Sequence, residues 1–288
     1  MDREVELEII RRAYAKQIVH AARASDPRLE EALATLRRED FLRPGPWRIE
    51  RPLAGHQIAS VDDPLYLYQD AAVAIIPEKR LNNGQPSFLA FLISAGELQV
   101  AEHAVHIGTG TGYYTAIIGH LVGPTGHVTG IEIEPELAAI ARSNLAGFSQ
   151  IEVIEGDGSL VPFEPADVIY VNAGVSRLPD RWLDALKPNG RLVLPLAANF
   201  TTEDRHAMTR GALFVIKRQD EAYEARALSS TLIYPGVGLR DETSEKALAA
   251  ALTKPKSDMA KVRWLRRTDD IPEENCWLRA PGWSLAYE

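Results

Sequence analysis

Three glycines at alternate positions are the first residues of this sequence whose spacing suggests chemistry. In the segment AVHIGTGTGYYTA, Gly108, Gly110 and Gly112 follow a short apolar run and precede a run that predicts a helix. Glycine adopts backbone angles that other residues avoid and lets a ligand lie close to the main chain. The first turn of a helix also offers free N–H groups. The segment therefore predicts a ligand-binding turn, with a purely structural tight turn as the alternative.

Two acidic residues follow at the ends of the next two predicted strands. Glu132 ends the run VTGIE, and Asp157 stands between Gly156 and Gly158 in IEVIEGDGSL. A carboxylate at the first position can accept hydrogen bonds from ribose hydroxyls, and one at the second can accept a bond from an adenine amine. A solvated charge and an ordinary Asx turn are the respective alternatives. Because the carboxyl ends of neighbouring strands share one crevice in a doubly wound sheet, the three strand ends together predict a nucleoside pocket.

A dinucleotide is the competing ligand for such a pocket. Its fingerprint, G-x-G-x-x-G, needs a third glycine for close helix–strand packing. Tyr113 occupies that position here. This departure weighs against a nicotinamide-dependent dehydrogenase and favours a nucleoside that carries another group.

The elements that must position these residues alternate between strand and helix from residue 86 to about residue 216. This rhythm predicts an α/β fold, a doubly wound and mostly parallel sheet with helices on both faces. We expect an N-terminal region of helices and loops over residues 1–85, since prolines crowd its second half. The core spans 86–216, and an antiparallel edge with a C-terminal extension spans 217–288.

Composition narrows the class of protein. The 288 residues include one cysteine, Cys276, and carry a formal net charge of −8. There is thus no disulfide framework, and the acidic balance weighs against nucleic acid as a partner. No signal-peptide pattern and no apolar run of about 18 residues is present, so we expect a cytoplasmic protein without a membrane span. The histidines near the glycine-rich turn lack metal-ligand spacing, and His106 is expected to be a core residue.

A longer stretch resembles a known family. HIGTGTGYYTAIIGHLVGPTGHVTGIEIEPELAAIARSNL is similar to the S-adenosylmethionine motif of the protein-L-isoaspartate O-methyltransferases. The similarity extends to GDG at 156–158, ADVIYVNAG at 166–174 and LPDRWLDALKPNGRLVLPL at 178–196. Upstream, RREDFLRPG and the segment Tyr68-Gln69-Asp70 also resemble the family signature. The resemblance covers roughly residues 30–216.

The resemblance implies a class I, Rossmann-like methyltransferase with a seven-stranded sheet. It implies S-adenosyl-L-methionine as cofactor, S-adenosyl-L-homocysteine as product and no metal. The residues that would bind the cofactor are Gly108, Thr109, Gly110, Gly112, Tyr113, Glu132, Ile133, Asp157, Gly158 and Asn172. Ile133 would cover one face of the adenine, or else serve simply as strand core.

The acceptor end departs from the family pattern. Gly84 stands in NNGQPSFLAFL where the family usually has a serine, although Pro86 matches. Asn83, Gln85 and Asp70 are the polar residues that we expect near the acceptor, with turn formation as the alternative for the two amides. The expected acceptor is a carboxylate of a protein or peptide, which is already ionised at neutral pH and needs no general base.

Other functions stay open on the sequence alone. The chain could methylate a small molecule, or bind S-adenosylmethionine without catalysis. A homodimer is also compatible with the sequence, and residues 217–288 could cover the acceptor site or form the dimer contact.

Overall fold

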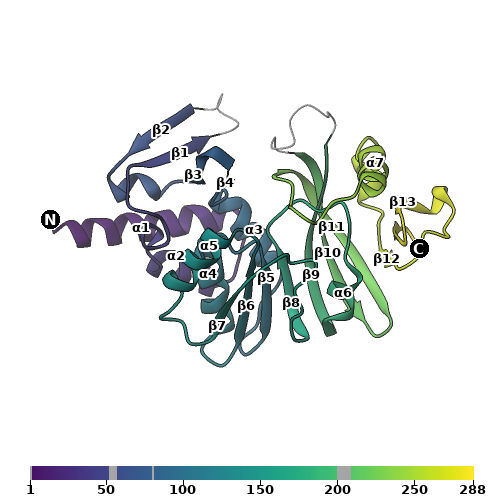
Figure 1. Ribbon diagram of the computed structural model, residues 1–288, viewed down its shortest axis with the longest axis horizontal. Coiled ribbons are helices and arrows are strands. Elements are labelled where there is room, and N and C mark those ends of the chain that lie inside the picture. Colours follow the sequence, from purple (N-terminus) through teal and green to yellow (C-terminus); the bar gives the residue numbers. More distant parts are fainter. Residues whose placement is uncertain (1, 52–56, 80, 200–208) are drawn as a thin grey trace. The chain divides into compact units, whose positions relative to one another are not determined.

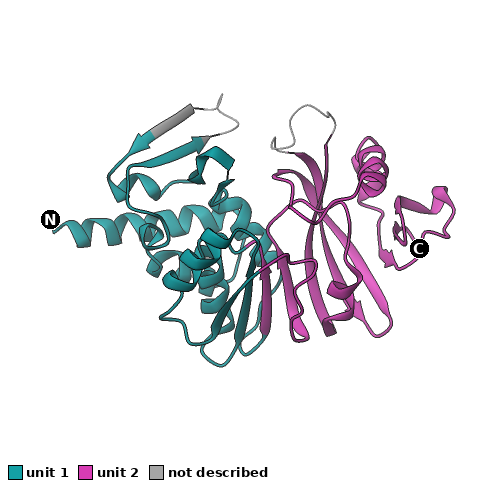
Figure 2. Cartoon of the chain, viewed as in Figure 1, with its two compact units in different colours: residues 1–102, 109–155 teal, residues 103–108, 156–288 magenta. Residues whose placement is uncertain are grey.

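The chain forms two compact units in a computed structural model that describes residues 2–51, 57–79, 81–199 and 209–288. Unit 1 contains residues 1–102 and 109–155, and unit 2 contains residues 103–108 and 156–288 (Figure 2). Figure 1 labels most of the helices and strands of the two units. The predicted segments 1–85, 86–216 and 217–288 divide the chain differently from these compact units.

The described residues of unit 1 form five α-helices. They are α1 (Arg3–Ala21), α2 (Pro27–Thr35), α3 (Pro86–Ala95), α4 (Tyr113–Val122) and α5 (Pro135–Asn144). Proline begins three of them, where its missing N–H costs nothing. Asp26 caps α2 by accepting the N–H of Arg28 at 2.9 Å. The Arg28 guanidinium in turn donates to the carbonyls of Leu121 and Leu98, at 2.9 and 2.7 Å, and so fastens α2 to the end of α4.

The strands of unit 1 form two groups. β1 (Trp47–Arg51), β2 (Gln57–Val61), β3 (Ala72–Ile76) and β4 (Leu81–Asn82) make an antiparallel sheet in the order β2-β1-β3-β4. β6 (His127–Glu132) and β7 (Ile151–Glu155) pair in parallel, with Glu132 at the carboxyl end of β6. The prolines of this part are compatible with these short strands, and its described residues form no long helix.

Unit 2 carries the parallel strands β5 (His103–Ile107), β8 (Ala166–Val171) and β9 (Leu186–Ala198). Two long antiparallel strands follow, β10 (Thr209–Gln219) and β11 (Ala222–Ile233). The short helix α6 (Asp180–Asp184) connects β8 to β9. The core lies on these strands, where β5 is buried along its whole length.

The C-terminal residues continue the sheet of unit 2. β12 (Trp264–Arg266) pairs with β11, and β14 (Trp283–Ala286) lies between β12 and β13 (Cys276–Ala280). Helix α7 (Glu242–Ala251) packs against β9 and β13, and α8 (Lys256–Met259) is a single turn. The ring of Trp277 lies 5.4 Å from that of Phe214, and both residues are buried. The C-terminal extension is thus integral to unit 2.

The fold class predicted from the sequence is confirmed: an α/β architecture with a mostly parallel central sheet. Among the described residues, unit 2 holds eight strands. Five of them (β5 and β8 to β11) belong to the expected seven-stranded core, whose other two strands, β6 and β7, are in unit 1, and β12 to β14 are additional. The segment Pro188-Asn189-Gly190 has the composition of a typical helix stop. It instead bulges within β9, where Asn189 has a φ of +63° and the register with β8 shifts. In the part of the chain that the structure describes, no helix has the length and apolar character needed to cross a membrane.

Candidate functional site

The glycine-rich turn enters unit 1 at Thr109 and starts helix α4. Gly112 caps the helix with a φ of +97°, and a Cβ atom there would lie 2.9 Å from Leu145. Gly110 has a φ of +59°, and a Cβ atom there would meet nothing within 4 Å. Gly112 is therefore needed for packing, whereas the main chain at Gly110 borders open space. That openness fits a turn against which a ligand lies.

Glu132 is tied directly to this turn. Its Oε2 atom accepts the N–H of Gly110 at 2.6 Å, and its Oε1 atom accepts the N–H of Glu134 at 3.0 Å. The residue is only 6% exposed, and burial raises the pKa of its carboxyl group, against the opposing effect of these N–H groups. Each carboxylate oxygen has a second lone pair, so the group can still accept bonds from ribose hydroxyls.

The other predicted cofactor residues of unit 1 have largely packed side chains. Thr109 is buried, and a Cβ atom at Gly130 would lie 2.7 Å from its hydroxyl oxygen. Tyr113 is buried with its ring centre 5.4 Å from that of Phe41. Ile133 is half-buried. Their cofactor roles remain predictions, and for Thr109 and Tyr113 the main chain is the part that could meet a ligand.

Unit 2 contains the remaining predicted cofactor residues. Oδ1 of Asp157 accepts the N–H of Ser159 at 2.7 Å, so the Asx turn given as the alternative to adenine binding is present, and the adenine role of this carboxylate remains a prediction. Gly158 is buried, and a Cβ atom there would lie 2.5 Å from Ile107. Asn172 donates its main-chain N–H to the Ile107 carbonyl at 2.8 Å.

Gly108 ends the unit 2 side of the turn, with a φ of +86°. A Cβ atom there would lie 3.3 Å from the Asn172 carbonyl oxygen. Both the backbone angle and the close neighbour therefore favour glycine at this position.

At the predicted acceptor end, the structure brings Asp70 and Gln85 together. The Gln85 amide donates to Oδ2 of Asp70 at 2.9 Å. Ser87 also donates its hydroxyl to Oδ2 at 2.7 Å and its N–H to Oδ1 at 2.8 Å. Asp70 thus caps the first turn of α3, and three donors converge on one exposed carboxylate.

Asn83 lies apart from that exposed group. It is 8% exposed, and its side-chain oxygen accepts the Val73 N–H at 2.8 Å and an Arg38 N–H at 3.3 Å. Its role as an acceptor contact stays a prediction. The observed hydrogen bonds stabilise the main chain around β3.

Arg38 is a residue that sequence reasoning missed. It is fully buried, and its guanidinium also donates to the carbonyls of Leu67, Gln69 and Ala71. It therefore holds the segment that carries Asp70. Its place in the family-like run RREDF was the available signal.

Gly84 explains the departure from the family serine. Its φ is +76°, and a Cβ atom there would lie 2.6 Å from a methyl carbon of Leu89. The local backbone is therefore shaped for glycine, and a serine could not occupy it without strain.

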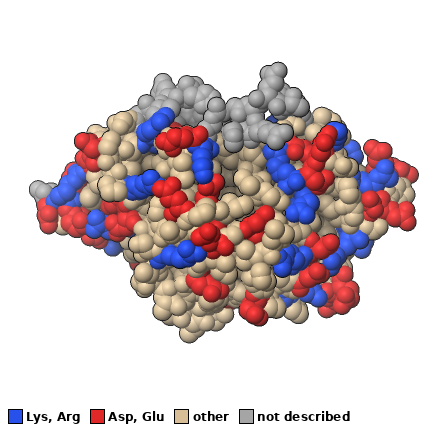
Figure 3. Space-filling model, viewed as in Figure 1, with Lys and Arg blue, Asp and Glu red and all other residues tan. Residues whose placement is uncertain are grey.

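Other reactive groups stand outside this set. His106 is fully buried beside Tyr170, and burial lowers the pKa of its imidazole to about 3. Cys276 is buried, and burial raises the pKa of its thiol. Among the described residues, no group of three or more His, Cys, Asp and Glu side chains could hold a metal ion. Figure 3 shows lysine and arginine interspersed with acidic side chains over the viewed face.

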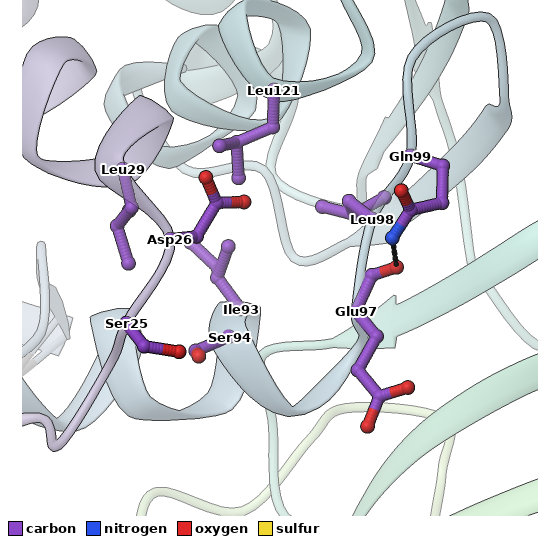
Figure 4. A pocket seen from close by; sticks show the side chains of 9 residues that line it. All are labelled: Ser25, Asp26, Leu29, Ile93, Ser94, Glu97, Leu98, Gln99 and Leu121. Atoms are coloured by element: carbon purple, nitrogen blue, oxygen red, sulfur yellow. Dashed lines mark hydrogen bonds between the residues drawn. The ribbon is translucent and has the colours of Figure 1, made fainter.

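A small hollow of unit 1 lies away from these residues. It encloses about 250 Å³ and is lined by nine residues from the α2, α3 and α4 region, among them Asp26, Leu29 and Gln99 (Figure 4). The Gln99 amide donates to the Glu97 carbonyl at 2.8 Å at its rim. None of its lining residues is a predicted site residue.

Comparison with known proteins identifies the family. Residues 57–234 match the family model described as Protein-L-isoaspartate(D-aspartate) O-methyltransferase (PCMT). The chain belongs to this protein-L-isoaspartate O-methyltransferase family. A family member from Brucella anthropi is 31% identical over 227 residues, which cover 77% of this chain and 91% of that protein. One from Ignicoccus hospitalis is 41% identical over 115 residues, but these span only 38% of this chain and 54% of that relative.

Solved structures of the family share the fold. A protein-L-isoaspartate O-methyltransferase with 25% identity has a TM-score of 0.63, covering 89% of this chain and 72% of the other. A Plasmodium falciparum structure, titled as a putative member in complex with S-adenosyl-L-homocysteine, has 16% identity and a TM-score of 0.60. That match covers 81% of this chain and 99% of the other, and at this identity it supports the fold alone.

Proposed function

We propose that this protein transfers a methyl group from S-adenosyl-L-methionine to a carboxylate of a protein or peptide. Family membership supports methyl transfer. The observation that carries the cofactor assignment is the bond between buried Glu132 and the N–H of Gly110. It joins the glycine-rich turn to an acid whose remaining lone pairs suit a ribose.

The residues proposed for the cofactor fit a nucleoside that carries an amino acid. Gly110 leaves the main chain open to a ligand, and Glu132 offers acceptors for two hydroxyls. We assign Asp157 to the adenine amine, together with Gly108, Gly112, Gly158 and Asn172 as neighbours of the cofactor. When bound, the cofactor would supply an electrophilic methyl group on a sulfonium.

The reaction requires little acid–base chemistry from the protein. An acceptor oxygen would form a bond to the methyl carbon as the carbon–sulfur bond breaks, and the electron pair would stay on sulfur. Because the carboxylate is ionised at neutral pH, no proton has to move. The protein's task is alignment, which can contribute roughly 7–11 kcal/mol to the barrier lowering.

At the acceptor end we propose Asp70 and Gln85, with Ser87 as an added donor. All three donor groups now point at Asp70, which is itself an anion. An acceptor carboxylate would have to share or displace these donors. Without a hydroxyl at Gly84, the isoaspartyl group is one candidate acceptor rather than a settled one.

Calorimetry with S-adenosyl-L-homocysteine and with NAD tests the cofactor assignment. We expect the former to bind and the latter not to bind, and NAD binding alone would refute the proposal. A tritiated methyl donor can then be offered to an isoaspartyl peptide and to its aspartyl twin. Base-labile, volatile counts would identify a methyl ester, and counts from the isoaspartyl peptide alone would establish that acceptor.

A further inference from the structure

A segment beyond the predicted core folds against the carboxyl end of β8 in unit 2. Residues 234–239 follow β11, and residues 174–177 follow β8. The Gly174 N–H donates to the Tyr234 carbonyl at 2.8 Å, and the Gly236 N–H donates to the Gly174 carbonyl at 2.9 Å. The N–H groups of Ser176 and Arg177 donate to the Leu239 carbonyl at 3.0 and 3.1 Å. Four main-chain bonds therefore fix the segment in place.

Arg177 joins the segment to the turn that carries Asp157. Its Nη2 atom donates to the Gly238 carbonyl at 3.1 Å and lies 3.4 Å from the Ser159 hydroxyl. The Ser159 N–H is the donor that holds Oδ1 of Asp157. The main chain at Gly238 and the Asp157 turn are thus tied through one side chain.

Gly238 itself lies directly against the Asp157 carboxylate. A Cβ atom on Gly238 would lie 2.1 Å from Oδ2, 2.8 Å from Cγ and 3.0 Å from Oδ1 of Asp157. No real pair of atoms approaches so closely, so any side chain at residue 238 would push the carboxylate away. Because the segment is fixed by main-chain bonds, the carboxylate is the group free to move.

We infer that Gly238 is a positioning residue for Asp157, and that its lack of a side chain keeps the carboxylate where it can accept the adenine amine. This inference rests on the proposed function, because it assumes that Asp157 meets the nucleoside. It gives the C-terminal part of the chain a role in cofactor affinity.

The test compares Gly238→Ala with Gly282→Ala. Both glycines have a φ of +77°, but a Cβ atom at Gly282 would meet nothing within 4 Å. The two variants therefore carry the same backbone strain, and only the first displaces Asp157. We expect similar falls in melting temperature. In calorimetry with S-adenosyl-L-homocysteine, Gly238→Ala should bind about tenfold more weakly or worse, as for a lost bond to a charged group, while Gly282→Ala binds like the wild type.

Asp157→Ala completes the design. In that background, Gly238→Ala should change the affinity by no more than about twofold, because the group it displaces is gone. If Gly238→Ala binds as tightly as Gly282→Ala, the inference is wrong while the cofactor assignment stands. An equal loss with and without Asp157 also overturns it, since the effect then does not run through the carboxylate. A wild-type protein that does not bind S-adenosyl-L-homocysteine overturns both the inference and the proposed function.

Discussion

Restoring the family serine at Gly84 is expected to harm this protein. Gly84→Ser places a side chain on a backbone with a φ of +76°, which costs about 1–2 kcal/mol for a non-glycine residue. Its Cβ atom would also lie 2.6 Å from Cδ1 of Leu89, which is 2% exposed and can shift only into packed core. Overpacking of this kind costs roughly 1–3 kcal/mol.

The two costs sum to about 2–5 kcal/mol of unfolding free energy. A central value of about 3 kcal/mol lowers the melting temperature by roughly 6–12 °C. Thermal unfolding followed by circular dichroism measures this directly. Gly282→Ser is the matched control, because it has the same φ in open space and should show the strain cost alone.

The methyl-transfer assay completes this test. We expect no gain in transfer to an isoaspartyl peptide, because the added Cβ atom forces the loop that carries Gln85 to shift. A Gly84→Ser protein as stable as Gly282→Ser would show that the side chain of Leu89 can shift at little cost in unfolding free energy. A variant that is both fully stable and more active on that peptide would refute the reasoning, and would mean that the loop already accommodates the family geometry.

Four further outcomes are expected. Acidification should weaken S-adenosyl-L-homocysteine binding at a pH above the ordinary glutamate pKa, since burial raises the pKa of Glu132 and only the ionised form accepts two hydroxyls. Calorimetry from pH 7 to pH 4.5 should show that the affinity of Glu132→Gln depends less on pH than that of the wild type. His106 has a folded-state pKa of about 3, below its ordinary value of 6.5, so its stabilising effect is complete above pH 6.5 and is lost as the pH falls toward 3. At about 1.36 kcal/mol per pH unit, roughly 3 kcal/mol of unfolding free energy should disappear between pH 7 and pH 4 in urea titrations. His106→Gln should not show this part of the loss. Asp70→Ala should lower stability by about 1 kcal/mol through loss of a helix cap and should raise KM for the peptide; an unchanged KM would remove Asp70 from the acceptor site. Arg38→Lys should retain the charge but lose the several guanidinium hydrogen bonds to the segment that carries Asp70. We therefore expect kcat to fall several-fold with little change in S-adenosyl-L-homocysteine affinity. An equal loss of kcat and of affinity would indicate a general folding defect.

Most of the fold follows from local patterns. Proline at the start of helices, glycine at their ends and short apolar runs predict the elements from residue 86 to residue 216 closely. The bulge at Asn189 was missed because Pro-Asn-Gly is also a typical helix stop, and only pairing with β8 keeps the chain in β9. The three added strands are not apparent within the C-terminal extension, because the pairing that joins them to the sheet, β12 with β11, connects residues more than 40 positions apart, such as Tyr223 and Leu265.

Some residues of the candidate site can likewise be predicted from local sequence, and others cannot. Glycines that need positive φ, and acids at strand ends, are visible in sequence because backbone geometry dictates residue type. Which amide faces a ligand is not visible: Asn83 and Gln85 are two positions apart, yet one is buried against Arg38 and the other is exposed beside Asp70. Gly238 could not be recognised as a neighbour of Asp157, because 81 positions separate them and only the fold brings them together.

The family match ends at residue 234, but the hydrogen-bonded sheet does not. Truncation at that point would remove β12, the strand that pairs with β11 at Tyr223 and Glu224. It would also remove Trp277, whose ring lies beside that of Phe214. An unpaired edge strand beside an exposed aromatic surface promotes self-association. A shortened protein of this kind should therefore aggregate on expression, because residues 86–216 need the segment after residue 234 to complete their sheet.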